Sequence, residues 1–130
     1  MLILTVRTDS PMAQIGLFDS ETQLELESWE AGRQLAETIH SKANELLMKH
    51  RKNWHSIEGI VCFEGPGSFT GLRIGLTVAN SLSYGLGTPI VSSKGDNWLE
   101  AGISKLLEGQ NDIIALPRYG SDPHITNPRK

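Results

Sequence analysis

The feature that most restricts the fold of this chain is a glycine-rich run in its middle, GPGSFTGLR at residues 65–73. It follows an apolar run at 57–63 that is typical of a buried strand, and it leads into a helix-like run at 70–86. Glycine permits positive φ and close backbone approach, whereas proline fixes φ and removes an amide donor. The run therefore predicts a strand, a tight loop and a helix in direct succession.

Two interpretations of this loop follow from its residues. Free amides and the helix dipole favour negative charge at a helix N-terminus, which makes the loop a candidate cradle for a phosphate or a carboxylate. The same glycines also suit a tight turn that lets the helix pack on a sheet. The loop lacks the Lys-Ser/Thr pair of a Walker A loop, and its glycine spacing differs from the dinucleotide fingerprint. The candidate loop residues are Gly65, Pro66, Gly67, Ser68, Phe69, Thr70, Gly71 and Arg73, of which Ser68 or Thr70 is placed to cap the helix.

The periodicity of the remaining chain predicts an α/β domain. Three strands linked by turns come first, and strands then alternate with helices, which gives a mixed sheet with helices packed on it. This order, βββαβαβα with a last strand, is the pattern of a single ribonuclease-H-like half of the actin/Hsp70-type ATPase fold. The expected strands cover residues 2–6, 13–18, 24–28, 57–63, 89–91 and 112–116, and the expected helices cover 31–52, 70–86 and 97–107.

The glycine-rich run also carries a family resemblance. Residues 65–76 (GPGSFTGLRIGL), residues 79–87 (ANSLSYGLG) and Pro89 closely resemble the TsaB (YeaZ) family, and the resemblance extends over roughly residues 1–108. Members of that family are accessory subunits of the bacterial machinery that makes threonylcarbamoyladenosine in tRNA. The resemblance implies a domain at 1–116 of the N-terminal TsaB type, followed by an irregular, proline-containing basic tail at 117–130. TsaB relatives usually have two such halves, so the chain resembles a truncated, one-domain form.

The resemblance further implies a function through partners. In relatives, the first two helices form the surface that pairs with the catalytic subunit TsaD, and also a homodimer in its absence. The expected role is a non-catalytic scaffold that binds and activates a TsaD-like subunit, with a TsaE-like ATPase joining them and tRNA reached indirectly through the complex. Small residues at helical spacing on the second helix suit either a subunit contact or close packing on this chain's own sheet. The candidate interface residues are Leu35, Ile39, Ala43, Leu46, Gly71, Leu72, Gly75, Leu76 and Ala79.

No catalytic residue, metal or cofactor is expected. Actin-like ATPases and TsaB relatives commonly carry Asp-Thr-Ser after the first strand, where this chain reads Arg7-Thr8-Asp9-Ser10. A cation in place of the Asp opposes magnesium–nucleotide chemistry, although Asp9 could fill the same role after a shift. The four histidines, His40, His50, His55 and His124, lack the spacing of a metal motif.

Two alternative functions remain open from the sequence. One is a small nucleotide- or anion-binding enzyme that uses the glycine loop with Glu64 or Asp9. The other is a stand-alone homodimeric binding module. They differ from the scaffold in what they predict: micromolar nucleotide binding for the first, and self-association that no partner displaces for the second.

Charge and composition favour a cytoplasmic protein without a membrane segment. The net charge is −3, and because the tail at 117–130 is basic, the remainder is more acidic than the whole, which argues against direct binding of RNA phosphates. Apolar runs are too short to cross a bilayer, and the first residues lack the pattern of a signal peptide. The lone cysteine, Cys62, lies in an apolar strand and is expected to be a buried small hydrophobe.

Overall fold

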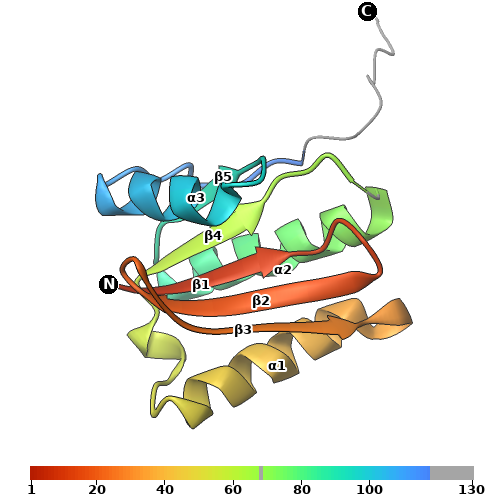
Figure 1. Cartoon of the computed structure of the whole chain (residues 1–130), viewed down its shortest axis with the longest axis horizontal. Coiled ribbons are helices and arrows are strands. Elements are labelled where there is room, and N and C mark those ends of the chain that lie inside the picture. Colours follow the sequence, from red (N-terminus) through yellow and green to blue (C-terminus); the bar gives the residue numbers. More distant parts are fainter. Residues whose placement is uncertain (68, 118–130) are drawn as a thin grey trace, which may run out of the picture.

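A five-stranded mixed sheet forms the centre of the molecule in a computed structural model, which describes residues 1–67 and 69–117 (Figure 1). The strand order is β3-β2-β1-β4-β5. Strands β1, β2 and β3 pair antiparallel as a meander, and β4 and β5 continue the sheet parallel to β1. The strands are β1 Leu2–Arg7, β2 Met12–Asp19, β3 Thr22–Glu30, β4 Gly59–Phe63 and β5 Ile90–Ser93.

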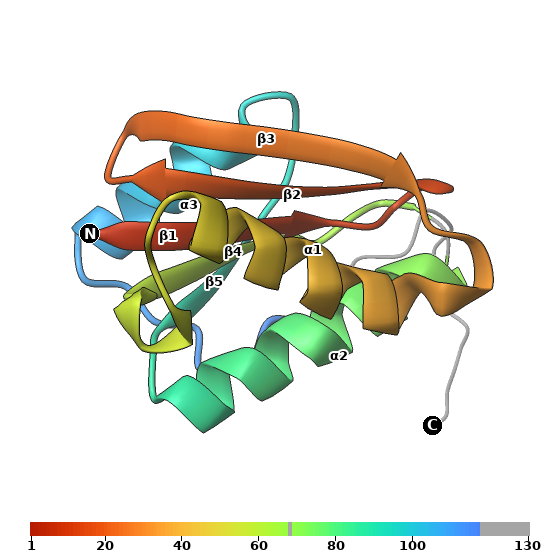
Figure 2. The same cartoon turned by 90° about the horizontal axis from the view of Figure 1, so that it is seen from below.

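Helices cover the sheet unequally on its two faces. Helices α1 and α2 lie side by side on one face, and α3 packs on the other face over β4 and β5 (Figures 1 and 2). The helices are α1 Leu35–Lys49, α2 Phe69–Leu86 and α3 Trp98–Leu107, with short 3-10 turns at Gly32–Gln34 and Trp54–Ser56. This arrangement confirms the expected mixed sheet with helices packed on it.

Two apolar clusters hold these layers together. The larger lies between the sheet and α1 and α2, and includes Leu4, Ile15, Ile39 and Leu72. The smaller lies under α3, where Trp98 packs edge-on against Phe63 with ring centroids 5.5 Å apart. Alternation of side chains along β1 sends Leu4 and Val6 to the first cluster and Ile3 to the second, because successive residues of a strand point to opposite faces.

The first helix is shorter than the periodicity predicts. A helix was expected over 31–52, but α1 begins at Leu35 after a 3-10 turn and ends at Lys49. Arg51 adopts a positive φ of 61°, a conformation that cannot continue a right-handed helix.

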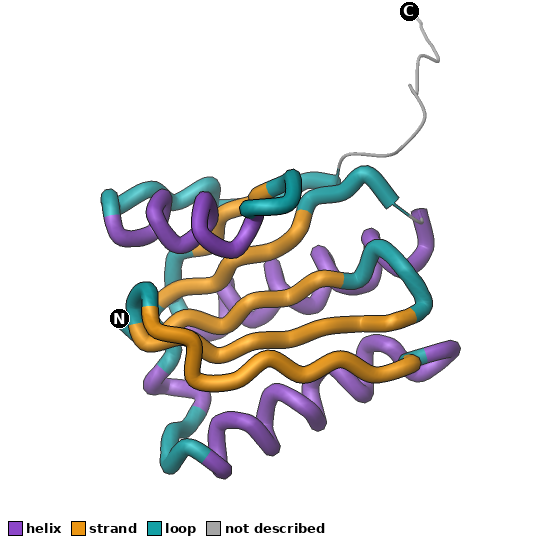
Figure 3. The backbone as a smooth tube through the Cα atoms, in the orientation of Figure 1, coloured by secondary structure: helices purple, strands orange, loops and turns teal. Residues whose placement is uncertain are grey.

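The expected strand at 112–116 is absent, and that prediction is wrong. After α3 the chain runs back beside β5 as a loop, drawn in teal in Figure 3. Side chains of this loop take the place of a strand backbone: the amides of Ile90 and Ser92 donate to Asn111 Oδ1 at 3.2 Å and to Asp112 Oδ2 at 2.9 Å. Because these amides are already occupied, a regular ladder with β5 cannot form there.

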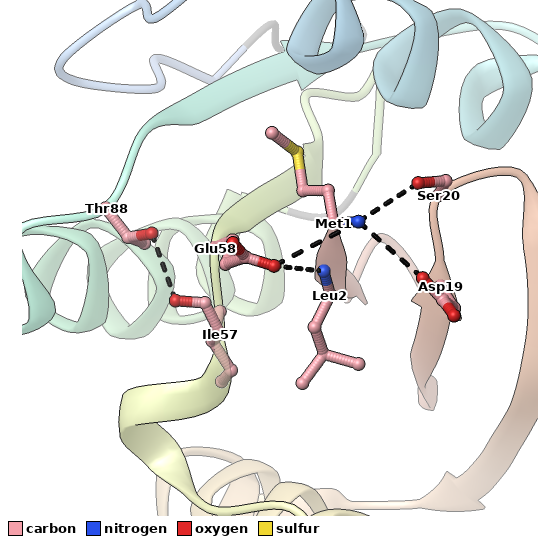
Figure 4. A network of polar contacts seen from close by, with 7 residues as sticks. All are labelled: Met1, Leu2, Asp19, Ser20, Ile57, Glu58 and Thr88. Carbon is pink, nitrogen blue, oxygen red and sulfur yellow. Dashed lines mark hydrogen bonds and ion pairs between the residues drawn. The ribbon is translucent and has the colours of Figure 1, made fainter.

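Polar contacts fix the N-terminal end of β1, opposite the glycine loop (Figure 4). Glu58 accepts the Leu2 amide at 3.0 Å, and the Met1 amine lies 3.6 Å from Asp19 and donates to Ser20 Oγ at 3.0 Å. These contacts join β1, the β2–β3 turn and the segment before β4. Their effect is to hold the register of the central strands, from which the glycine loop emerges at the other end.

Among the described residues 1–67 and 69–117, no helix combines the length and the apolar character that crossing a bilayer requires.

Candidate functional site

The glycine loop joins β4 to α2 and lies against the end of β1. Gly65 adopts a φ of 110°, which glycine accepts readily, and it precedes Pro66. A Cβ on Gly67 would overlap the Cβ of Asp9 and lie 3.0 Å from the Asp9 carbonyl oxygen. The absence of a side chain at Gly67 is therefore what allows the loop to sit on the segment after β1. Ser68, one of the two expected capping residues, lies outside the described residues, and Thr70 is already inside α2.

The first turns of α2 are fastened to the same segment by Thr8. Its hydroxyl donates to the carbonyl of Gly71 at 2.8 Å, and Thr8 itself is 2% exposed. A Cβ on Gly75 would overlap that hydroxyl. Gly75 thus lets helix α2 approach the segment after β1 closely, which agrees with the packing interpretation of this small-residue stripe.

Arg7 and Asp9, which follow one another closely at the end of β1, form an ion pair. Arg7 Nε donates to Asp9 Oδ1 at 2.8 Å, and the guanidinium also donates to Asp9 Oδ2 at 3.1 Å. The guanidinium lies 4.0 Å from the ring centroid of Phe63, a cation–π distance. Asp9 also packs against Gly67. An anion bound in the loop would therefore lie next to the Asp9 carboxylate, and the nearby Arg7 is already paired with that carboxylate.

Two further candidates, Cys62 and Glu64, lie at the end of β4. The backbone amide of Glu64 donates to the Ser93 carbonyl at 2.8 Å, which fixes this strand end against β5. Burial raises the pKa of the Cys62 thiol to about 12, so the thiolate that a nucleophile requires is disfavoured. Within residues 1–67 and 69–117, no group of three or more His, Cys, Asp or Glu side chains is close enough together to hold a metal ion.

The expected interface residues lie in the core, which corrects their role as an exposed surface. Ile39, Ala43, Leu72 and Ala79 are 0% exposed, and all belong to the cluster beneath α1 and α2. These side chains hold the two helices on the sheet and on each other. None of the other expected interface residues is exposed. Leu35, Leu46, Gly75 and Leu76 are buried, and Gly71 is half-buried.

The outward side of the same two helices carries a groove that the sequence analysis missed. It has a volume of about 390 Å³ and lies between α1 and α2, lined by Ala36, Thr70, Arg73, Ile74, Thr77 and Val78. Arg73 is the only charged residue among the 18 residues of α2. The exposed positions on either side of it, Thr70 and Thr77, are uncharged. An exposed helix face almost without charge is the signal that could have identified this groove, because charged residues are depleted at the core of protein interfaces.

Charged residues gather instead where α1 crosses β3. Glu25 accepts from His50 Nε2 at 2.9 Å and from Lys49 Nζ at 3.0 Å, and Lys42 lies 2.9 Å from Glu27. Hydrogen bonds from His50 and then Lys49 hold the pKa of Glu25 below its ordinary value. These contacts attach the edge strand to α1 and leave the groove side of α1 free of them.

Comparison with known proteins relates the chain to proteins whose names refer to one tRNA modification. A family model described as TsaD, tRNA N6-adenosine threonylcarbamoyltransferase, matches residues 29–94. A protein of that name from Geotalea daltonii is 34% identical over 99 residues, which cover 73% of this chain and 28% of that protein. The TsaB protein of Haemophilus influenzae is 25% identical over 88 residues, covering 64% of this chain and 37% of that protein. The chain thus covers only 28% and 37% of the lengths of these two relatives.

Solved structures confirm the expected ribonuclease-H-like fold. YeaZ from Pseudomonas aeruginosa superposes with a TM-score of 0.65 at 22% identity, over 72% of this chain and 43% of that one. RuvC from Thermus thermophilus superposes with a TM-score of 0.51 at 14% identity, over 72% of this chain and 64% of that one. At these identities the likeness establishes the fold alone.

Proposed function

Because this chain belongs to the family of TsaD and TsaB (YeaZ) proteins, we propose that it acts in the biosynthesis of threonylcarbamoyladenosine in tRNA. Its role there is that of a non-catalytic scaffold, which binds a TsaD-like catalytic subunit through the outward side of α1 and α2. A TsaE-like ATPase and the tRNA would meet this chain only through that complex. The observation that carries the proposal is the groove between α1 and α2, together with an outer surface of α2 that is nearly free of charge.

The groove supports a protein contact by its shape and its chemistry. Ile74 and Val78 are half-buried on its floor, and Ala36 and Thr77 are small, exposed residues on its two sides. A helix of the partner can approach closely where side chains are this small, and apolar area becomes buried without desolvating a charge. Arg73, which also lines the groove, offers a single cation for a carboxylate of the partner.

A scaffold rather than a catalyst is supported by the state of the ATPase-like position. Arg7 neutralises Asp9 through two hydrogen bonds, so this carboxylate does not stand ready for a metal-bound phosphate. The chain would then act by binding one conformation of the TsaD-like subunit better than another, which shifts that subunit toward its competent state.

The groove can be tested by charge placed on its exposed rims. Thr77→Lys in α2 and Ala36→Lys in α1 keep helix-forming residues at exposed positions, so the domain is expected to stay folded. Each variant should lose co-purification with the TsaD homologue of its own source. Ser104→Lys, at an exposed position of α3 on the opposite face, is the matched control and should bind normally. Normal binding by both groove variants would exclude this surface, and failure of the wild-type chain to bind would exclude the partner.

Gly75→Leu and Ala79→Glu are unsuitable for this test. Gly75 leaves no room for a Cβ beside Thr8, and Ala79 is 0% exposed. Loss of the complex in either variant would report a damaged core rather than a damaged interface.

A further inference from the structure

A polar hollow lies at the end of the molecule opposite the glycine loop, and we propose that it binds a small zwitterion, a free amino acid. It has a volume of about 330 Å³ and is lined by the start of β1, the β2–β3 hairpin, the end of α1 and the segment before β4. Figure 4 shows part of its lining, Met1, Leu2, Asp19 and Glu58. The hollow shares no lining residue with the groove between α1 and α2, so a ligand here leaves that groove open.

Lys52 supplies the hollow with a cation that has no partner. Within residues 1–67 and 69–117, no hydrogen bond or ion pair engages its ammonium group. His50 also lines the hollow, but its Nε2 is already engaged by Glu25 Oε1 at 2.9 Å. The Lys52 ammonium is therefore the group that can pair with the anionic end of a ligand, because a charge-assisted hydrogen bond is stronger than a neutral one.

Two carboxylates in the same hollow each keep one oxygen unused. Glu58 Oε1 accepts the Leu2 amide at 3.0 Å and lies 4.0 Å from the Met1 amine, and Asp19 Oδ1 lies 3.6 Å from that amine. In the described part of the chain, no contact involves Glu58 Oε2 or Asp19 Oδ2. These two oxygens can accept the ammonium group of a ligand, in the way that their neighbours face the Met1 amine (Figure 4).

The backbone that carries Lys52 is fixed by hydrogen bonds within the chain. Its amide donates to the Leu47 carbonyl at 2.7 Å, and Arg51 adopts a φ of 61°, so the chain turns back at the end of α1. The Asn53 amide then donates to Ser56 Oγ at 3.2 Å, and that hydroxyl donates to Asn53 Oδ1 at 3.3 Å. A wall that is held in place without a ligand lowers the entropy lost on binding.

Opposite charges in one small concavity select the class of ligand. A simple anion would pair with Lys52 but would also lie near two carboxylates. A metal ion lacks ligands, since residues 1–67 and 69–117 bring no three His, Cys, Asp or Glu side chains close enough together to hold one. A zwitterion offers an anionic group to Lys52 and an ammonium group to Asp19 and Glu58, so that each sign of charge is paired. The volume, near the lower end of the range for small-molecule sites, suits a ligand of amino-acid size.

Calorimetric titration of the whole chain with individual amino acids tests this proposal. We expect at least one standard amino acid to bind with a millimolar or lower dissociation constant, and to raise the melting temperature of the chain when present in excess over that constant. Its N-acetyl derivative lacks the ammonium charge and its amide lacks the carboxylate, so each should bind at least about tenfold more weakly. Failure of every standard amino acid to bind overturns the proposal, and so does equal binding of the free, N-acetyl and amide forms.

Two variants test whether the binding occurs in this hollow. Lys52→Met removes the charge and keeps a stem of similar length, and Glu58→Gln keeps an acceptor for the Leu2 amide, so both variants are expected to stay folded. Each should weaken amino-acid binding by about tenfold or more. Lys94→Met, at an exposed position after β5, is the matched control and should bind normally. Binding at full strength by both Lys52→Met and Glu58→Gln would place the ligand elsewhere and overturn the assignment.

Discussion

Two glycines in the loop and in α2 mark where distant parts of the chain touch. Gly67 meets Asp9 and Gly75 meets Thr8, so the β4–α2 unit is seated on the segment after β1. The sequence predicts the strand, the loop and the helix, because their periodicity and turn residues are local. It does not predict which residue faces each glycine, since these contacts join positions 58 and 67 residues apart and depend on the sheet order.

A methyl group at Gly75 should destabilise the domain. Thr8 cannot turn away from it without giving up its bond to the Gly71 carbonyl. Overpacking costs about 1–3 kcal/mol, and alanine recovers about 1 kcal/mol through helix propensity, so Gly75→Ala should lower the free energy of unfolding by up to about 2 kcal/mol. Urea unfolding monitored by circular dichroism measures this change.

Gly85→Ala is the matched control in the same helix. No atom lies within 4 Å of a Cβ built there. Helix propensity then acts alone, and the free energy of unfolding should rise by up to about 1 kcal/mol. A gain in stability for Gly75→Ala as well would show that Thr8 does not confine that position.

Among the elements, β3 shows how context decides what an alternating strand does. Its alternation of Leu24 and Leu26 with Glu25 and Glu27 predicts an antiparallel strand with one charged face, and the strand forms. The charged face does not point to bulk solvent, however, because Glu25 and Glu27 pair with residues of α1. The expected strand at 112–116 fails for a related reason: its own side chains bind the edge of β5.

The attachment of β3 to α1 should depend on pH through Glu25. Its folded-state pKa is lowered below the ordinary value of 4.5, so its stabilising effect is fully present above that value and is lost as the pH falls through the folded pKa. Glu25→Gln should therefore lower the melting temperature at neutral pH and lessen its fall between neutral and acidic pH.

Thermal melts from pH 7 to about pH 3 measure this dependence. Glu100→Gln, on the exposed side of α3, serves as the control and should leave the pH profile of the wild-type chain unchanged. Parallel profiles for the wild-type chain and Glu25→Gln would show that the contacts of Glu25 with His50 and Lys49 contribute nothing measurable.

Across the whole molecule, α2 has a buried side that builds the core and an outer side that borders the groove. The resemblance implies an interface on α1 and α2, but the apolar residues chosen by helical spacing fall on the buried side. Leu35, Ile39 and Leu72 are examples. Helical spacing identifies the face that is buried, and it cannot tell a buried core face from a surface awaiting a partner. The near absence of charge on the outer side of α2 is the better indicator.

The central claim is that this chain activates a TsaD-like subunit without performing the chemistry itself. The most direct test is threonylcarbamoylation of tRNA by the TsaD homologue of its own source, supplied with the TsaE homologue and the donor, with and without this chain. The account predicts modification that requires the wild-type chain, fails with Thr77→Lys and survives with Ser104→Lys. Modification at the same rate in the absence of the chain would contradict it.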